Sequence, residues 1–188
     1  MKIALTGSSS TGKTTLANEL MKSEMFAELV GEFIFEDARS LLRSLGHKSM
    51  DDMSRIELRR FQEAYLKQKS ENEVGRNRFL VDRSFADVAA YWLVRDSFDL
   101  SYEIQEAFAR QCRELALSYD LHVYFPLGQI PFDADGYRSE NQDFHERIGS
   151  KIHELLNDWG MPYLTIESQD LEARVQQVLA AVLSEGSY

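Results

Sequence analysis

Residues 7–15 read GSSSTGKTT, and this stretch decides how the rest of the chain is interpreted. It follows Lys2-Ile3-Ala4-Leu5, whose apolar residues predict a strand over about residues 2–6. The residues after it predict a helix over about 13–22. A loop of glycines and hydroxyl side chains at this place lets backbone N–H groups curl around an anion, and the helix N-terminus adds partial positive charge.

The spacing Gly7-x-x-x-x-Gly12-Lys13-Thr14 is a full match to the Walker A motif. Lys13 would bring a compact cation to the β- and γ-phosphates, and Thr14 would offer its hydroxyl to Mg²⁺. We therefore expect ATP and Mg²⁺ as ligands; the alternative is a Ser/Gly-rich turn that only caps a helix. The predicted nucleotide-binding residues, of which Lys13 is also predicted to be catalytic, are Gly7, Ser8, Ser9, Ser10, Thr11, Gly12, Lys13, Thr14 and Thr15.

Apolar runs and helical patterns alternate along the rest of the chain. Strands are expected near 28–31, 77–82, 121–125 and 163–166, and helices near 33–45, 51–73, 84–95, 102–118, 141–158 and 170–184. This alternation indicates an α/β fold with a doubly wound parallel sheet. Ligands bind at the carboxyl ends of such strands. We therefore expect residues 7–14, Glu32, Asp82, the loop 127–140 and the loop near Glu167 to share one edge of the sheet.

Length and composition restrict the class of protein. The 188 residues suit one domain spanning 1–188, and the net charge of −10 argues against a broad nucleic-acid-binding or acidic-membrane surface. Cys112 is the only cysteine, so an intrachain disulfide is impossible, which fits a reducing cytoplasm. The apolar runs are far shorter than the ~18 residues of a spanning helix. We expect a cytoplasmic protein whose partner is a small molecule.

Asp82 and Arg83 follow the apolar run Phe79-Leu80-Val81. A carboxylate at the end of a buried strand beside the phosphate loop can hold Mg²⁺ or accept a proton from a substrate hydroxyl. Asp82 is therefore predicted to be catalytic and a metal ligand, and Arg83 to bind the substrate. The alternative is that Asp82 or Ser84 only caps the helix that follows.

A second acidic and basic group begins after the expected strand 28–31. On a helix, Glu32, Glu36, Arg39 and Arg43 recur at spacings of four, three and four, and would share one face. Glu36 is predicted to be catalytic, offering its carboxylate to a nucleophilic hydroxyl, and Arg39 and Glu32 to bind the substrate. The alternative is a solvated helix with ordinary ion pairs.

The loop 127–140 is long for a compact domain and is predicted to be a lid. Arg138 would reach the transferring phosphoryl group and stabilise its charge, and Arg147 is a second candidate for that role. The alternative is a surface loop with a solvated arginine. Several aromatic residues could stack on a base, although core packing is favoured for each: Phe61, Tyr65, Phe85, Tyr91 and Trp92.

The motifs together resemble a known group. GSSSTGKT, Glu36-Asp37-Ala38-Arg39, the strand-end Asp82 and Asp135-Gly136-x-Arg138 are similar to the AAA-type P-loop domain family that contains the NadR-type ribosylnicotinamide kinase domain. Asp82-Arg83-Ser84 is also similar to motifs of thymidylate and deoxynucleoside kinases, and it replaces an Asp-Thr-Asp-like run of NadR-type kinases. The resemblance implies a P-loop NTPase fold with a five-stranded parallel core, and phosphoryl transfer from ATP to a nucleoside-like acceptor.

We therefore expect a small-molecule kinase that uses ATP and Mg²⁺ to phosphorylate a nucleoside, a nucleotide or a ribosylnicotinamide-like acceptor. One alternative is a P-loop ATPase or nucleotide-dependent switch that acts through a protein partner. Another is a kinase acting on a nucleic-acid end, against which the acidic net charge argues. Asp82 with its neighbouring arginine and the arginine-bearing lid favour the small-molecule kinase, because a switch does not need an acceptor pocket.

Overall fold

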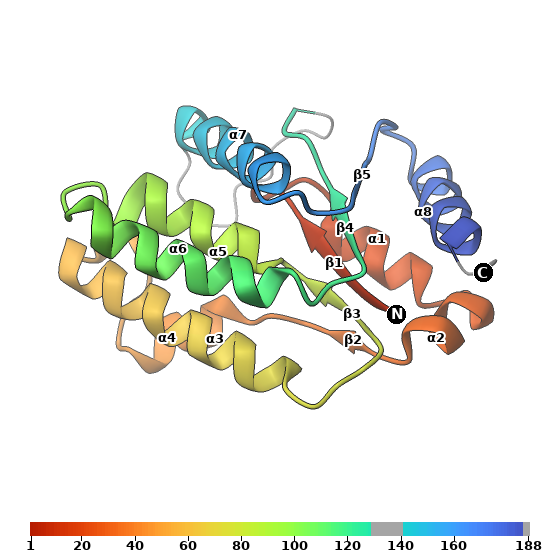
Figure 1. Ribbon diagram of the computed structural model, residues 1–188, viewed down its shortest axis with the longest axis horizontal. Helices are drawn as coiled ribbons and strands as arrows, with labels where there is room; N and C mark the ends of the chain where they lie inside the picture. The colour runs from red at the N-terminus through yellow and green to blue at the C-terminus, as the bar shows by residue number, and fades with distance from the viewer. Residues whose placement is uncertain (129–140, 186–188) are drawn as a thin grey trace.

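The computed structural model describes residues 1–128 and 141–185. Five parallel strands form one sheet in the order β2-β3-β1-β4-β5 (Figure 1). Their bounds are β1 Lys2–Thr6, β2 Phe33–Ile34, β3 Phe79–Asp82, β4 Leu121–Tyr124 and β5 Tyr163–Thr165. The predicted α/β fold with a five-stranded parallel sheet is confirmed.

Helices connect the strands and cover both faces of the sheet, as predicted (Figure 1). The α-helices are α1 Lys13–Leu20, α2 Glu24–Val30, α3 Ala38–Ser44, α4 Arg55–Glu73, α5 Phe85–Tyr91, α6 Tyr102–Ala116, α7 Gln142–Asp158 and α8 Leu171–Glu185. A 3₁₀-helix, Met50–Asp52, precedes α4, and a π-helix, Trp92–Asp96, continues α5. The helix predicted near 84–95 is therefore wound more loosely in its last turn.

The alternation of side chains along β1 divides the core in two. Ile3 and Leu5 face α1, α2 and α8, whereas Ala4 faces the larger cluster formed by α4, α5, α6 and α7. β1 lies at the centre of the sheet, with Leu5 opposite Asp82 on β3 and Thr6 opposite Tyr124 on β4. The segment that leaves β1 therefore emerges between the carboxyl ends of β3 and β4, which fixes the place of residues 7–15.

The strand predicted near 28–31 is wrong, because this segment is the end of helix α2. The Ser23 side chain accepts a hydrogen bond from the Phe26 N–H at the start of that helix. Gly31 ends it with φ +77° and donates its N–H to the Ala27 carbonyl. The strand β2 comes after this turn and pairs with β3 through only two residues, Phe33 and Ile34. The strand end consequently lies several residues later than predicted.

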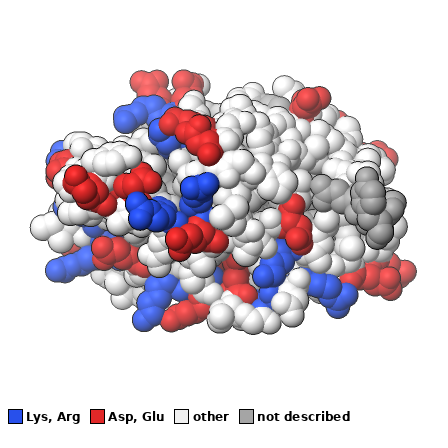
Figure 2. Space-filling model, viewed as in Figure 1, with Lys and Arg blue, Asp and Glu red and all other residues white. Residues whose placement is uncertain are grey.

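Surface charge is mixed on the face seen in Figure 2, where acidic and basic side chains alternate. No large basic area gathers among the residues drawn on this face, which agrees with the net charge of −10.

Among residues 1–128 and 141–185, no helix is long and apolar enough to cross a membrane.

Candidate active site

The loop between β1 and α1 has the backbone geometry of an anion cradle. Ser10 and Gly12 have φ values of +58° and +84°, and these turns bring the chain around to the first turn of α1. The Lys13 ammonium donates hydrogen bonds to the Gly7 carbonyl at 2.9 Å and to the Ser8 carbonyl at 2.6 Å. Lys13 therefore already lies inside the loop, where its charge would meet phosphate oxygens.

Gly7 is a position where the fold admits no larger residue. Its φ is +143°, and a Cβ built there would lie 2.6 Å from the backbone oxygen of Phe125, at the end of β4. This close approach lets the loop begin directly at the sheet edge. The first glycine of the motif is thus required by packing against β4 as well as by conformation.

Gly7→Ala is therefore expected to destabilise the protein by more than about 2 kcal/mol, because backbone strain of about 1–3 kcal/mol adds to the Cβ clash. Urea unfolding measures the loss. Gly75→Ala is the matched control: Gly75 has φ +77° but no atom within 4 Å of the added Cβ, so it reports strain without the clash. Equal losses in the two variants would contradict the packing role of Gly7.

Asp87 on α5 connects the loop to the neighbouring strand end. It is buried, and its carboxylate accepts hydrogen bonds from the Thr6 hydroxyl at 2.6 Å, the Gly7 N–H at 3.1 Å and the Ser84 N–H at 2.8 Å. It also lies 3.7 Å from a guanidinium nitrogen of Arg83. A single carboxylate therefore joins the ends of β1 and β3, and the sequence motifs gave no signal for it.

Asp82 and Thr14 meet at the carboxyl end of β3. The Thr14 hydroxyl donates to Asp82 Oδ2 at 3.1 Å, while Asp82 Oδ1 is buried and has no hydrogen-bond partner among residues 1–128 and 141–185. Hard oxygen ligands of this kind suit Mg²⁺, which takes one or two protein ligands and completes its shell with phosphates and water. The part of the chain that the structure describes has no cluster of three acidic, His or Cys side chains for a metal. The pair Thr14 and Asp82 therefore fits Mg²⁺ bound together with a nucleotide.

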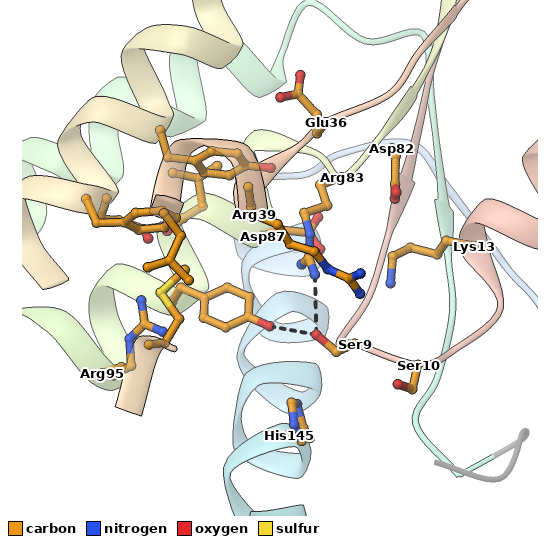
Figure 3. A pocket seen from close by; sticks show the side chains of 18 of the residues that line it. Ser9, Ser10, Lys13, Glu36, Arg39, Asp82, Arg83, Asp87, Arg95 and His145 are labelled. Carbon is orange, nitrogen blue, oxygen red and sulfur yellow. Dashed lines mark hydrogen bonds and ion pairs between the residues drawn. The ribbon is translucent and has the colours of Figure 1, made fainter. Parts of the chain in front are cut away.

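Arg83 follows Asp82 in a left-handed conformation, with φ +71°. Non-glycine residues rarely adopt this conformation, and such strain is concentrated at functional sites. The turn aims the guanidinium at the phosphate loop, where it donates to the Ser9 hydroxyl at 3.3 Å and lies 5.6 Å from the centre of the Tyr91 ring. In Figure 3, Arg39 and Arg83 point to the side of the pocket where Lys13 and Ser9 lie.

The four residues predicted to share a helical face are separated by the structure. Arg39 and Arg43 lie on α3, whereas Glu36 lies between β2 and α3 and lines the cavity. Glu32 precedes β2, at the amino end of that strand, where it pairs with Arg76. The prediction that Glu32 lies on the ligand-binding edge is wrong, because the strand ends after Ile34.

Glu36 is a buried carboxylate of the site. Its side chain is 0% exposed, and neither oxygen has a hydrogen-bond partner among the described residues. Burial raises the pKa of Glu36 above its ordinary value, an effect that the nearby Lys69 ammonium opposes. A carboxylate of this kind is a candidate proton acceptor, since a general base works best with its pKa close to the operating pH.

One cavity of about 1280 Å³ joins these groups. It is larger than the roughly 300–1000 Å³ of a pocket for one small ligand. The phosphate loop from Ser9 to Thr15 forms one end. The basic side chains that line it are Lys13, Arg39, Arg43, Arg83, Arg95 and Arg147. The aromatic side chains that line it are Phe35, Phe61, Tyr65, Tyr91 and Phe144.

The predicted site residues therefore gather in one place with two exceptions. Glu32 lies elsewhere, and Arg138, with most of the predicted lid 127–140, lies outside the described residues. Sequence reasoning missed three buried polar residues around the site: Lys69, Asp87 and Arg174, the last of which donates to the Thr11 carbonyl at 3.3 Å. In the sequence, a buried charged residue on a helix has the same spacing as an exposed one, so the pattern does not distinguish them.

Comparison with known proteins gives one family match. The family model described as AAA domain matches residues 2–174 of the chain. No curated protein matches the sequence.

Solved structures of several kinases have the same fold. The chain is similar to deoxyadenosine kinase from M. mycoides (TM-score 0.68, 16% identity, covering 98% of this chain and 99% of that one). It is also similar to thymidylate kinase from Candida albicans (TM-score 0.70, 16% identity, 98% and 92%). The NadR protein in complex with NR matches with a TM-score of 0.62 and 18% identity, over 95% of this chain and 50% of that one. The fold is thus the P-loop NTPase fold of these kinases.

Proposed function

The chain belongs to the AAA domain family. On this basis, we propose that it is an ATP-dependent kinase of a small nucleoside-like molecule. The observation that carries the proposal is the cavity of about 1280 Å³, whose lining includes the phosphate loop, the buried carboxylate Glu36 and several aromatic side chains. A donor nucleotide alone would need the phosphate loop but not the buried carboxylate. The solved kinases of this fold act on nucleosides or nucleotides by their printed names, which favours the same class of acceptor.

In this proposal, Lys13 and the loop N–H groups bind the β- and γ-phosphates of ATP. Thr14 and Asp82 would hold Mg²⁺, which when bound neutralises charge on those phosphates. The acceptor hydroxyl attacks the γ-phosphorus, the bond from that phosphorus to the bridging β,γ-oxygen breaks, and ADP leaves. Glu36 takes the hydroxyl proton. Arg39 and Arg83 orient the acceptor and the transferring group, and the predicted role of Arg138 in a lid over residues 127–140 stays a proposal.

The test is ADP formation from ATP and Mg²⁺ with a panel of nucleosides, nucleoside monophosphates and nicotinamide riboside, with the phosphorylated product identified by mass. One class of acceptor is expected to raise ADP release and to gain one phosphate. ADP release that no acceptor changes would contradict the proposal and favour the nucleotide-dependent switch.

Asp82→Asn keeps the shape of the side chain and removes its charge. We expect transfer to slow by at least ~10²-fold and to require more Mg²⁺, because the amide oxygen of asparagine brings no negative charge to the metal beside the Thr14 hydroxyl. Rates measured across a Mg²⁺ series check this expectation. Asp158→Asn, at the exposed end of α7, is the control. A normal rate and Mg²⁺ dependence in Asp82→Asn would contradict both predicted roles of Asp82, since Ser84 is the residue that caps α5.

A further inference from the structure

A buried cluster of charged side chains lies behind the pocket wall at Glu36. Lys69 on α4 places its ammonium 2.6 Å from Glu73 Oε1 and 3.6 Å from Glu36 Oε1. Tyr119 precedes β4 in the chain, and its hydroxyl donates to the same Glu73 oxygen at 2.9 Å. One cation therefore stands between two carboxylates, and only one of the two, Glu36, belongs to the wall of the cavity.

Solvent does not reach the centre of this cluster. The side chains of Lys69 and Glu36 are 0% exposed, and the Lys69 ammonium lies 5.0 Å from the centre of the Phe85 ring. An unpaired charge in such surroundings costs several kcal/mol, so it persists only beside a partner of opposite sign. The burial of Lys69 thus requires at least one ionised carboxylate next to it.

The two carboxylates compete for this cation. Burial raises the pKa of Glu36, Lys69 lowers it, and the negative charge of Glu73 raises it. The other titratable groups that act on Glu36 are Asp82 on β3, which also raises its pKa, and the phenols of Tyr65 and Tyr119. Burial raises the pKa of both phenols well above the ordinary value and lowers that of His122, which faces Lys69 from β4, to about 4. These three groups are therefore neutral near pH 7.

We propose that Lys69 is the internal counter-ion of Glu36, a positioning residue that keeps this carboxylate ionised while Glu73 and Tyr119 hold the ammonium in place. The hydrogen bonds favour Glu73 as the permanent partner, since its oxygen receives both the closer ammonium contact and the Tyr119 hydroxyl. Among the described residues, Glu36 has only the longer ion pair with Lys69, and neither of its oxygens accepts a hydrogen bond. The consequence for phosphoryl transfer rests on the proposed function, whereas the electrostatic pairing does not.

Carboxyl titration by NMR tests the pairing without any enzymatic assay. The protein is labelled with ¹³C at the glutamate side-chain carboxyl carbons, and the Glu36 signal is assigned by its loss in Glu36→Gln. Lys69→Met is expected to move the titration of Glu36 to higher pH, because the cation that lowers its pKa is removed. Glu73→Gln is expected to move it to lower pH, because a competing negative charge is lost while an oxygen that accepts from Tyr119 is kept.

The chain supplies matched controls on the same helix. Lys67 and Glu71 form an exposed pair on α4, with side chains 77% and 65% exposed, so Lys67→Met and Glu71→Gln repeat both chemical changes at the surface. Neither control is expected to move the titration of Glu36. Glu73→Gln keeps the proposal testable if Lys69→Met does not fold.

Opposite shifts in the two buried variants, both larger than those in the controls, support the proposal. An unmoved Glu36 titration in a folded Glu73→Gln protein, or shifts of equal sign in the two variants, overturns it. Where an acceptor supports turnover, the acidic limb of the pH–rate profile is expected to shift in the same directions as the NMR titration. Failure of every acceptor leaves the NMR result unaffected, so loss of the proposed function and loss of the counter-ion role are told apart.

Discussion

Glu36→Gln is expected to slow phosphoryl transfer by about 10²–10⁴-fold and, at neutral pH, to raise the free energy of unfolding. The rate falls because glutamine cannot accept the proton of the acceptor hydroxyl. Stability rises because a carboxylate with a raised pKa is buried in ionised form in the wild type, and the variant carries no such charge. Single-turnover transfer and urea unfolding at pH 7 measure the two effects.

The stability difference has a defined pH dependence. The folded-state pKa of Glu36 is raised above the ordinary value of 4.5, so its folded form binds the proton more tightly than the unfolded chain does. Wild-type stability therefore increases as the pH falls through the raised pKa toward 4.5, and the advantage of Glu36→Gln shrinks over that interval. Glu71→Gln on the exposed face of α4 is the control. A normal transfer rate in Glu36→Gln, or an advantage that grows on acidification, would contradict the assignment.

Lys13→Met is expected to slow transfer by about 10²–10³-fold while the fold is retained. Methionine keeps most of the length of the side chain but brings no charge to the phosphates, where a positioned donor contributes this much to the transition state. The loop stays attached to the rest of the protein because the Gly7 N–H still donates to Asp87. ATP affinity by calorimetry and single-turnover rates with the identified acceptor give the two measurements.

Lys22→Met, just beyond the other end of α1, controls for loss of a lysine, since Lys22 is exposed and pairs with Glu19 at the surface. A folded Lys13→Met protein with the transfer rate of this control would refute phosphate binding by the loop. Loss of ATP affinity with a normal saturated rate would assign Lys13 to ground-state binding instead.

The central part of the fold follows from local sequence. The apolar run at residues 3–5, the glycines of the loop and Lys13 fix a strand, a tight turn and a helix in succession, and each of these is confirmed. The position of Asp82 is also predicted correctly. It is the last residue of an apolar strand, and the last residue of a parallel strand lies at the carboxyl edge of the sheet. These features depend on neighbours in the sequence, which pattern reasoning detects.

The second strand shows where this reasoning fails. The sequence ELVG at 28–31 is apolar enough for a strand, but Ser23 and Gly31 give helix α2 its two ends. Only two residues of β2 pair with β3, too few for a period-two pattern. Because the strand was predicted too early in the chain, the prediction placed Glu32 at the wrong edge of the sheet. Lys69 and Asp87 were missed for another reason, because the partners that connect them to the site, Glu36 for Lys69 and Thr6 and Gly7 for Asp87, lie 33 and 80 or more residues away in the chain.

The role of Asp87 has a consequence for how this sequence can diverge. Replacing Asp87 alone would leave the Thr6 hydroxyl and the N–H groups of Gly7 and Ser84 without their acceptor, at about 1–3 kcal/mol for each buried group. Such a total approaches the whole stability of a small domain. Gly7 and Ser84 donate through their backbone, so Thr6 supplies the side-chain donor of the three. Positions 6 and 87 are therefore epistatic: the effect of a substitution at one depends on the residue at the other. Two segments some 80 residues apart in the chain are thus constrained to evolve as one unit.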